Sequence, residues 1–184
     1  MTNFISPLLD RPGHSDVPHN VMREHILIVL VEDRIGSVDR VVGLMRRRRA
    51  NMHTLVLGRN SQPDMVRVTV VVNDSEVAVE HLVEQLRKIV DVHQVEYLTA
   101  QEAVTRELAL IRVNSSADNY NEVIETAHLF GAQIVDIAPE TVTVEVVGSV
   151  EKVEKFIEAL NPYGIRDVAR SGRVALARGT AAEA

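Results

Sequence analysis

A carboxylate, a lone glycine and a helix start meet between residues 33 and 37 and could together hold a small charged molecule. Asp33 follows a strand-like apolar run, and an amphipathic helical pattern begins after Gly36. N–H groups at a helix start lack partners and carry the positive end of the helix dipole, so a free carboxylate fits there. Gly36 lets backbone approach a ligand, and Asp33 could accept from an ammonium group. The pattern favours a zwitterionic amino acid; the alternative is a tight turn without a ligand.

Two polar features follow the helical pattern, and each has two interpretations. Asn51 either leaves the helix as a turn residue or points its amide at the glycine turn. The arginine run at 46–49 is either a solvated helix end, where cations are favoured, or a docking patch for an acidic partner.

The usual constellations of catalytic and metal-binding residues are missing from the sequence. The chain has no cysteine, and none of its seven histidines lies four residues from another. There is no nucleophile elbow, phosphate-binding loop or dinucleotide fingerprint. We therefore expect no catalytic residue and no metal site. The enzyme alternative is a site near one turn built from four residues: Glu32, Asp33, Arg34 and His53.

Composition restricts the partners and the compartment. The 184 residues carry a net charge of -6, which argues against nucleic acid as the main partner because phosphate binding needs clustered cations. Near the N-terminus, no apolar run is long enough for a signal peptide or a membrane span. We expect a soluble, cytoplasmic protein with no membrane contact.

Apolar periodicity predicts two successive β-α-β-β-α-β blocks. The first has strands at 26–31, 52–57, 66–72 and 92–98, a helix at 37–48, and a second helix, capped by Asp74 or Ser75, whose apolar stripe runs from Val79 to Val90. The second has strands at 107–113, 133–137, 142–146, 165–170 and 174–177. Its first helix opens with a capping box of Asn119 and Glu122, and its second carries a stripe from Val150 to Leu160.

This pattern predicts an α+β fold of two tandem ferredoxin-like βαββαβ domains. Residues 1–23 read as a flexible arm, with ordered structure from His25. The first domain is expected at 24–99, the second at 100–179, and a frayed tail at 180–184.

The segment ILIVLVEDRIGSVDRVVGLMRRRRANMHTLVLG resembles the amino-acid-binding ACT domain that opens the regulatory small subunit of acetolactate synthase (acetohydroxyacid synthase). The likeness continues through VDVHQVEYL, RELALIRV and FGAQIVDIAPETVTVEVVGSVEKVEKFIEALNPYGI, and it ends in VARSGRVALARG. It covers residues 23–179 in order. A generic ACT domain does not account for the second half.

The resemblance implies a non-catalytic regulatory subunit in branched-chain amino acid biosynthesis. In that family, the large catalytic subunit carries the thiamine diphosphate chemistry and is expected to hold thiamine diphosphate, FAD and Mg, with no cofactor in the small subunit. The small subunit raises its activity and commonly confers sensitivity to valine or another branched-chain amino acid. Two ACT domains pair as a homodimer with the effector at their interface. The alternative is a free-standing ACT-type amino-acid sensor acting on another enzyme or regulator.

The resemblance also assigns effector-binding residues. The strand-to-helix turn and the start of the second strand contribute Asp33, Arg34, Ile35, Gly36, Ser37, Asn51 and Met52. The chain departs from the family pattern at three of its positions: Asp33 stands where Asn is frequent, Arg49 where Gly is common, and Ala50 where an aromatic residue is often found.

Overall fold

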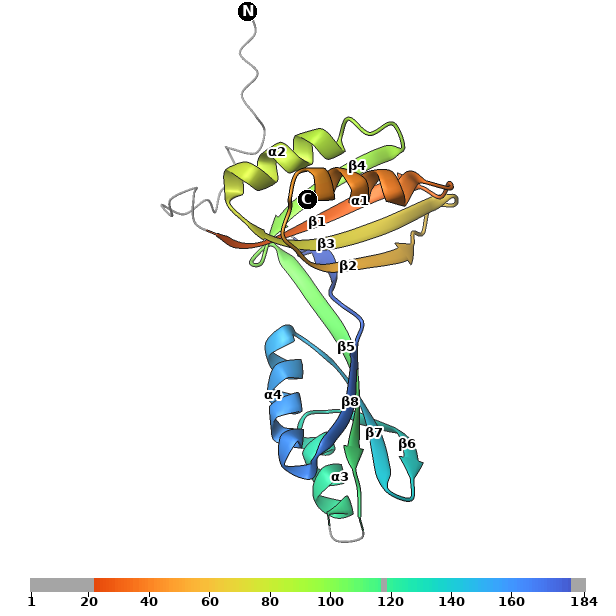
Figure 1. Cartoon of the computed structure of the whole chain (residues 1–184), viewed down its shortest axis with the longest axis vertical. Helices are drawn as coiled ribbons and strands as arrows, with labels where there is room; N and C mark the ends of the chain where they lie inside the picture. The colour runs from red at the N-terminus through yellow and green to blue at the C-terminus, as the bar shows by residue number, and fades with distance from the viewer. Residues whose placement is uncertain (1–21, 117–118, 180–184) are drawn as a thin grey trace, which may run out of the picture.

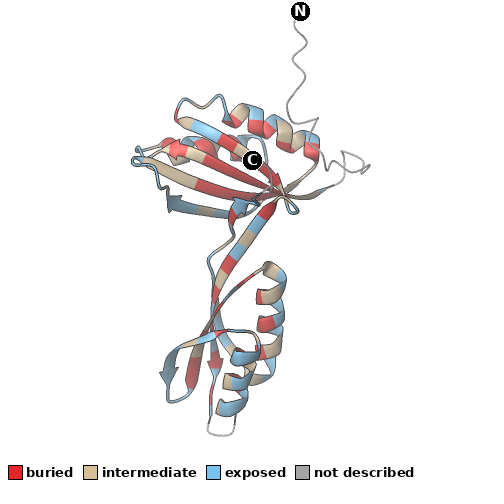
Figure 2. Ribbon diagram, turned by 180° about the vertical axis from the view of Figure 1, so that it is seen from behind, coloured by how far each residue is buried: buried red, intermediate tan, exposed pale blue. Residues whose placement is uncertain are grey.

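Two layered modules lie end to end in a computed structural model of the chain, which describes residues 22–116 and 119–179. Each module has helices on one face of an antiparallel sheet (Figure 1). Figure 2 shows the buried residues concentrated on the strands and on the helix faces turned toward them.

The first module is built from the alternating strands and amphipathic helices of residues 23–99. Its strand order is β2-β3-β1-β4, the arrangement of a ferredoxin-like sheet, with β2 and β4 at the edges. The elements are β1 (Arg23–Glu32), α1 (Ser37–Arg47), β2 (Met52–Arg59), β3 (Met65–Asp74), α2 (Glu76–Leu86) and β4 (Val92–Thr99).

The central strands of the first module are buried on both faces. Val68, Val70 and Val72 of β3 pack with α1 and α2 in the main core. Val71 points to the opposite face, because successive strand residues alternate, and there it joins a separate buried cluster.

The second module repeats the topology, with strand order β6-β7-β5-β8. Its helices and sheet enclose an apolar cluster, in which the rings of Phe130 and Phe156 lie with centroids 5.1 Å apart. The elements are β5 (Ala103–Asn114), α3 (Tyr120–Leu129), β6 (Gln133–Ala138), β7 (Thr141–Gly148), α4 (Val150–Leu160), a 3-10 turn (Asn161–Tyr163) and β8 (Ile165–Arg170).

The last strand returns to the first module. β9 (Val174–Ala177) pairs antiparallel with the beginning of β5. Ala175 then packs beneath the first sheet in the cluster that includes Ile26 and Val71, and Arg67 of β3 donates a 2.8 Å hydrogen bond to the Ala175 carbonyl. We call residues 171–173, between β8 and β9, the crossover segment.

The α+β fold with two ferredoxin-like βαββαβ modules is confirmed, and three local predictions are wrong. Ordered structure begins before His25, because Arg23 already pairs with Asp74. Val90 is not part of an inward helical stripe: α2 ends at Leu86, and the side chain of Val90 is 87% exposed.

The predicted capping box of α3 is also wrong. Asn119 does occupy the N-cap, but its backbone is in the αR region and its side chain makes no cap hydrogen bond. The extended backbone usual for a capping residue is missing, and Asn119 Oδ1 accepts instead from the N–H of Ser116 at 2.7 Å. Most of the predicted arm, residues 1–21, and the tail, residues 180–184, lie outside the described residues.

Candidate functional site

The turn at residues 33–36, here called the Gly36 turn, opens α1 without a side-chain cap. Gly36 occupies the N-cap with φ 87°, in the left-handed region that favours glycine. By contrast, Ser75 caps α2 by accepting from the Ala78 N–H at 3.3 Å, and Ser149 caps α4 in the same way. Among the described residues no side chain caps the start of α1, and a helix start of this kind suits an anion.

Hydrogen bonds hold the Gly36 turn in place. The N–H of Asp33 donates to the Asp64 carbonyl at 2.8 Å, and the N–H of Ser37 donates to the Arg34 carbonyl at 3.1 Å. The Ser37 side chain is fully buried, and no hydrogen-bond partner for its hydroxyl is found among the described residues. Of the predicted effector-binding residues, Ser37 therefore supports the turn from within, because its N–H is already bonded to Arg34 and the whole residue is buried.

Arg40 is a component of this site that sequence reasoning missed. A Cβ placed on Gly36 would lie 3.3 Å from Arg40 Nη1, so the guanidinium lies over the glycine. Arg40 Nε donates to the carboxylate of Asp91, which is buried. This hydrogen bond holds the pKa of the Asp91 carboxyl below its usual range. The sequence feature that could have revealed Arg40 is its i, i+4 spacing from Gly36, which places both residues on one face of the helix.

Carboxylates surround the mouth of the turn. Glu32 accepts from Arg34 Nε at 2.9 Å and lies 3.1 Å from His93 Nε2, so its charge already has partners. Asp33 is exposed beside them, and Ile35 projects fully into solvent. The site thus combines a helix start without a side-chain cap, a nearby guanidinium, an exposed carboxylate and an apolar side chain.

Asn51 lies at the opposite end of the same sheet. Its carbonyl accepts from the N–H of Asn73, whereas the Gly36 turn is bonded at Asp64. From position 64 to position 73 along β3 is about 30 Å at the usual rise per strand residue. The interpretation that Asn51 points its amide at the Gly36 turn of its own chain is therefore wrong.

The same register separates the other residues of the second strand from the turn. Met52 pairs with Val72 and is half-buried against the main core. His53 follows Met52 and cannot meet Asp33, so the enzyme alternative that placed both at one turn is also wrong. This separation is not visible in the sequence, because residues that flank one helix stand close together along the chain.

Arg49 leaves α1 with φ 55°, a conformation that L-residues other than glycine rarely adopt. The helix end is nevertheless closed, because the N–H of Ala50 donates to the Met45 carbonyl at 3.0 Å. Arg46, Arg47, Arg48 and Arg49 are all exposed. The end of α1 therefore keeps the left-handed backbone typical of glycine, although the residue there is Arg49.

The edge strand β2 presents apolar side chains to solvent. Leu55 and Leu57 are 39% and 51% exposed, although their register with Val70 and Val68 places them on the helix-covered face. An open edge with apolar side chains is a surface on which a second strand can pair.

Within residues 22–116 and 119–179, no group of three or more His, Cys, Asp or Glu side chains is arranged to hold a metal ion. Over the same residues, no helix is long and apolar enough to cross a membrane.

Comparisons with known proteins match both modules. A family model described as the small subunit of acetolactate synthase matches residues 106–179, and one described as the AHAS small subunit-like ACT domain matches residues 27–94. The acetolactate synthase small subunit of Mycolicibacterium smegmatis is 41% identical over 155 residues, covering 84% of this chain and 91% of that protein.

Two further relatives are more distant. A probable acetolactate synthase small subunit of Archaeoglobus fulgidus is 38% identical, over 85% of this chain and 98% of its own. The crystal structure of the small subunit from Thermotoga maritima has a TM-score of 0.81 at 29% identity, covering 86% of this chain and 99% of that one.

Proposed function

The chain belongs to the acetolactate synthase small subunit family, and on that premise we propose that it activates the large catalytic subunit and makes it responsive to a branched-chain amino acid. The observation that carries this proposal is the match of both modules, in order, to that family. A free-standing ACT-type sensor would need only the first module, so the match of residues 106–179 favours the subunit.

The effector site forms, in this proposal, between two copies of the chain. One copy supplies the Gly36 turn and the other supplies Asn51, since the two lie about 30 Å apart within one chain. Antiparallel pairing of two β2 edges places the Asn51 end of each strand beside the Arg59 end of the other. Arg59 is near the Gly36 turn, because it pairs with Val66, which also pairs with Val31. The exposed Leu55 and Leu57 support such pairing.

The chemistry of the turn fits a zwitterion with an apolar side chain. The uncapped start of α1, with the Arg40 guanidinium beside Gly36, receives the carboxylate. Asp33 is exposed and can accept from the ammonium group. Ile35 offers apolar surface for the branched side chain. Valine, leucine and isoleucine all meet this description.

The large subunit docks, in this proposal, on the second module and holds the thiamine diphosphate, FAD and Mg. The sheet face opposite α3 and α4 carries exposed apolar side chains, including Leu110 of β5 and Val147 of β7. An apolar patch of this kind is a frequent protein contact surface. Removing the whole module is a poor test, because Ala103 and Ala175 cover the underside of the first sheet.

The test measures acetolactate formation by the large subunit with and without the chain, and then with added valine, leucine or isoleucine. We expect no turnover by the chain alone, higher turnover in the mixture, and a response to at least one amino acid. Leu110→Arg should abolish activation, whereas Val90→Arg, an exposed valine of the first module, should not. Intrinsic turnover, or a mixture no faster than the large subunit alone, contradicts the proposal.

A further inference from the structure

His53 occupies a bulge at the start of β2. Met52 pairs with Val72 and Thr54 pairs with Val71, so His53 is the extra residue between two consecutive partners. Bulges redirect side chains and often lie next to functional sites. Here His53 Nδ1 lies 3.3 Å from Oε1 of Glu24, at the beginning of β1.

The same carboxylate binds a residue of the crossover segment. Arg173 donates to both oxygens of Glu24, from Nη1 at 2.5 Å and from Nη2 at 2.9 Å. This bidentate geometry is the most directional that an arginine makes with a carboxylate. The Arg173 side chain is only 15% exposed. Glu24 is therefore shared between β2 and the chain that leaves the second module.

The crossover segment is also packed directly on β2. Gly172 has φ 78°, and a Cβ placed there would lie 2.9 Å from Val56 Cγ2. On the other side, Ser171 Oγ accepts from the N–H of Leu108 at 3.0 Å. The segment thus touches β2 of the first module and β5 of the second within three residues.

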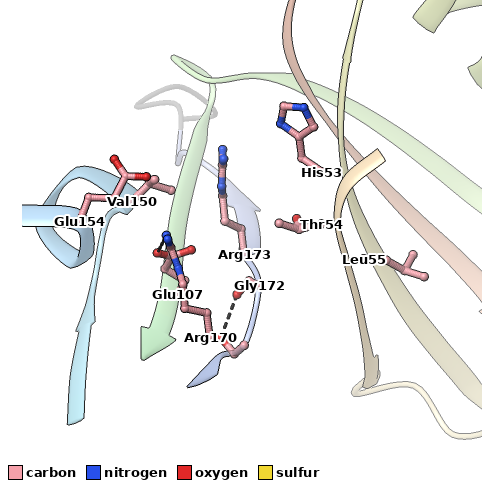
Figure 3. Close-up of a pocket in the computed structure, with 10 residues that line it drawn as sticks. His53, Thr54, Leu55, Glu107, Val150, Glu154, Arg170, Gly172 and Arg173 are labelled. Atoms are coloured by element: carbon pink, nitrogen blue, oxygen red, sulfur yellow. Dashed lines mark hydrogen bonds and ion pairs between the residues drawn. The ribbon is translucent and has the colours of Figure 1, made fainter. Parts of the chain in front are cut away.

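An open cleft of about 510 Å³ lies beside this contact, between β2 and α4. In Figure 3, Arg173 stands between His53 of β2 and the pair Val150 and Glu154 of α4, with Leu55 pointing away. Because the space between strand and helix is not filled by described side chains, the two modules have room to change their relative orientation.

We propose that His53, Glu24 and Arg173 form a coupling joint through which an amino acid bound at Asn51 and Met52 changes the orientation of the second module. The inference rests on the proposed effector site, because the joint begins one residue after Met52. A ligand that draws the start of β2 toward a partner chain moves the bulge, and Glu24 passes that movement to Arg173. The coupling is the difference in ligand affinity between the two orientations.

The test uses the full chain, which has no cysteine of its own. Spin labels on Glu84→Cys of α2 and Glu158→Cys of α4, both exposed, report the distance between modules. Labelled chain is diluted with unlabelled chain so that only distances within one chain are read. Calorimetry with valine, leucine and isoleucine identifies the amino acid that binds, and that amino acid is then used for the distance measurement.

We expect saturation with the bound amino acid to shift the distance distribution. Glu24→Gln should retain the heat of binding but lose the shift, and it should also lose the effect of that amino acid on the large subunit. Arg173→Met keeps the packing of the side-chain stem and should behave alike, which guards against a folding defect in the first variant. The matched control is Glu140→Gln, since Glu140 pairs with Arg166 at 3.4 Å on the exposed surface of the second module.

Each other outcome decides a separate point. Binding without a distance shift in the unaltered chain overturns the coupling joint and leaves the proposed function standing. A shift that persists in both Glu24→Gln and Arg173→Met also overturns it. If none of the three amino acids binds the unaltered chain, the proposed effector site is refuted, and the joint with it.

Discussion

A mixture of Gly36→Ala chains and Asn51→Ala chains will bind more effector than either variant alone. The prediction follows from the register of the first sheet, where the two residues are held about 30 Å apart along β3. No asparagine side chain spans that distance. In the proposed arrangement, each effector site therefore takes Gly36 from one chain and Asn51 from its partner.

Both variants are expected to fold. Alanine at Gly36 meets a φ of 87°, which costs about 1–2 kcal/mol, and its methyl group lies beside Arg40, where the proposed site receives the ligand carboxylate. Asn51 is exposed and holds Asn73 through its carbonyl, so Asn51→Ala leaves that hydrogen bond intact. A dimer of two Gly36→Ala chains has an altered turn in both sites, and a dimer of two Asn51→Ala chains lacks the amide in both sites.

The size of the recovery follows from symmetry. After equal amounts are mixed and allowed to exchange, half of the dimers are mixed, and each mixed dimer has one intact site and one doubly altered site. About a quarter of all sites are therefore restored. Calorimetric titration measures that fraction as the binding stoichiometry. A stoichiometry that stays at the level of the single variants after exchange, or full binding by either variant alone, refutes the arrangement.

Three further predictions concern stability. Arg49→Gly removes a strained left-handed residue and should stabilise the fold by about 0.5–1 kcal/mol, or about 2 °C in Tm; a lower Tm contradicts this. Phe156→Ala removes a fully buried ring that packs on Phe130 and should cost about 3–5 kcal/mol in urea unfolding; a cost below about 1 kcal/mol would mean that the core collapses to fill the space. The hydrogen bond from Arg173 lowers the pKa of Glu24 below 4.5, so its stabilisation is present above pH 4.5 and is lost as the pH falls through the folded-state pKa. The urea midpoints of the unaltered chain and Glu24→Gln should converge in acid, and a constant difference down to about pH 3 contradicts the assignment.

Strand and helix types were predictable because apolar spacing carries them locally. In β3 and β7, valines alternate with polar residues, and the buried stripe of α4 repeats at helical spacing. Ser75 was predictable as a cap because a serine before an apolar stripe is a local signal. Predictions of helix ends were wrong where the apolar spacing continued past the end of the helix. Val90 fits the helical spacing, but α2 ends at Leu86.

One part of the candidate site, the Gly36 turn, was predictable from the sequence, and its distance from Asn51 was not. The Gly36 turn could be read from adjacent residues, because a helix start follows directly from a strand end. The distance to Asn51 could not, because it depends on which strands pair and in what register. The contact of Glu24 with Arg173 joins residues 149 positions apart, and no local period encodes such a pair.

The position of β9 bears on how the chain is synthesised. The side chains of Ile26, Ile28 and Val71 form part of the first sheet's underside, which Ala175 of β9 helps to cover. A ribosome releases residues in order, so the first module emerges with part of this apolar underside uncovered while the second module is still being made. A chain truncated before Val174 keeps the other strands and helices of both modules but exposes apolar side chains on the underside of the first sheet. It should therefore be prone to aggregation and to binding by chaperones.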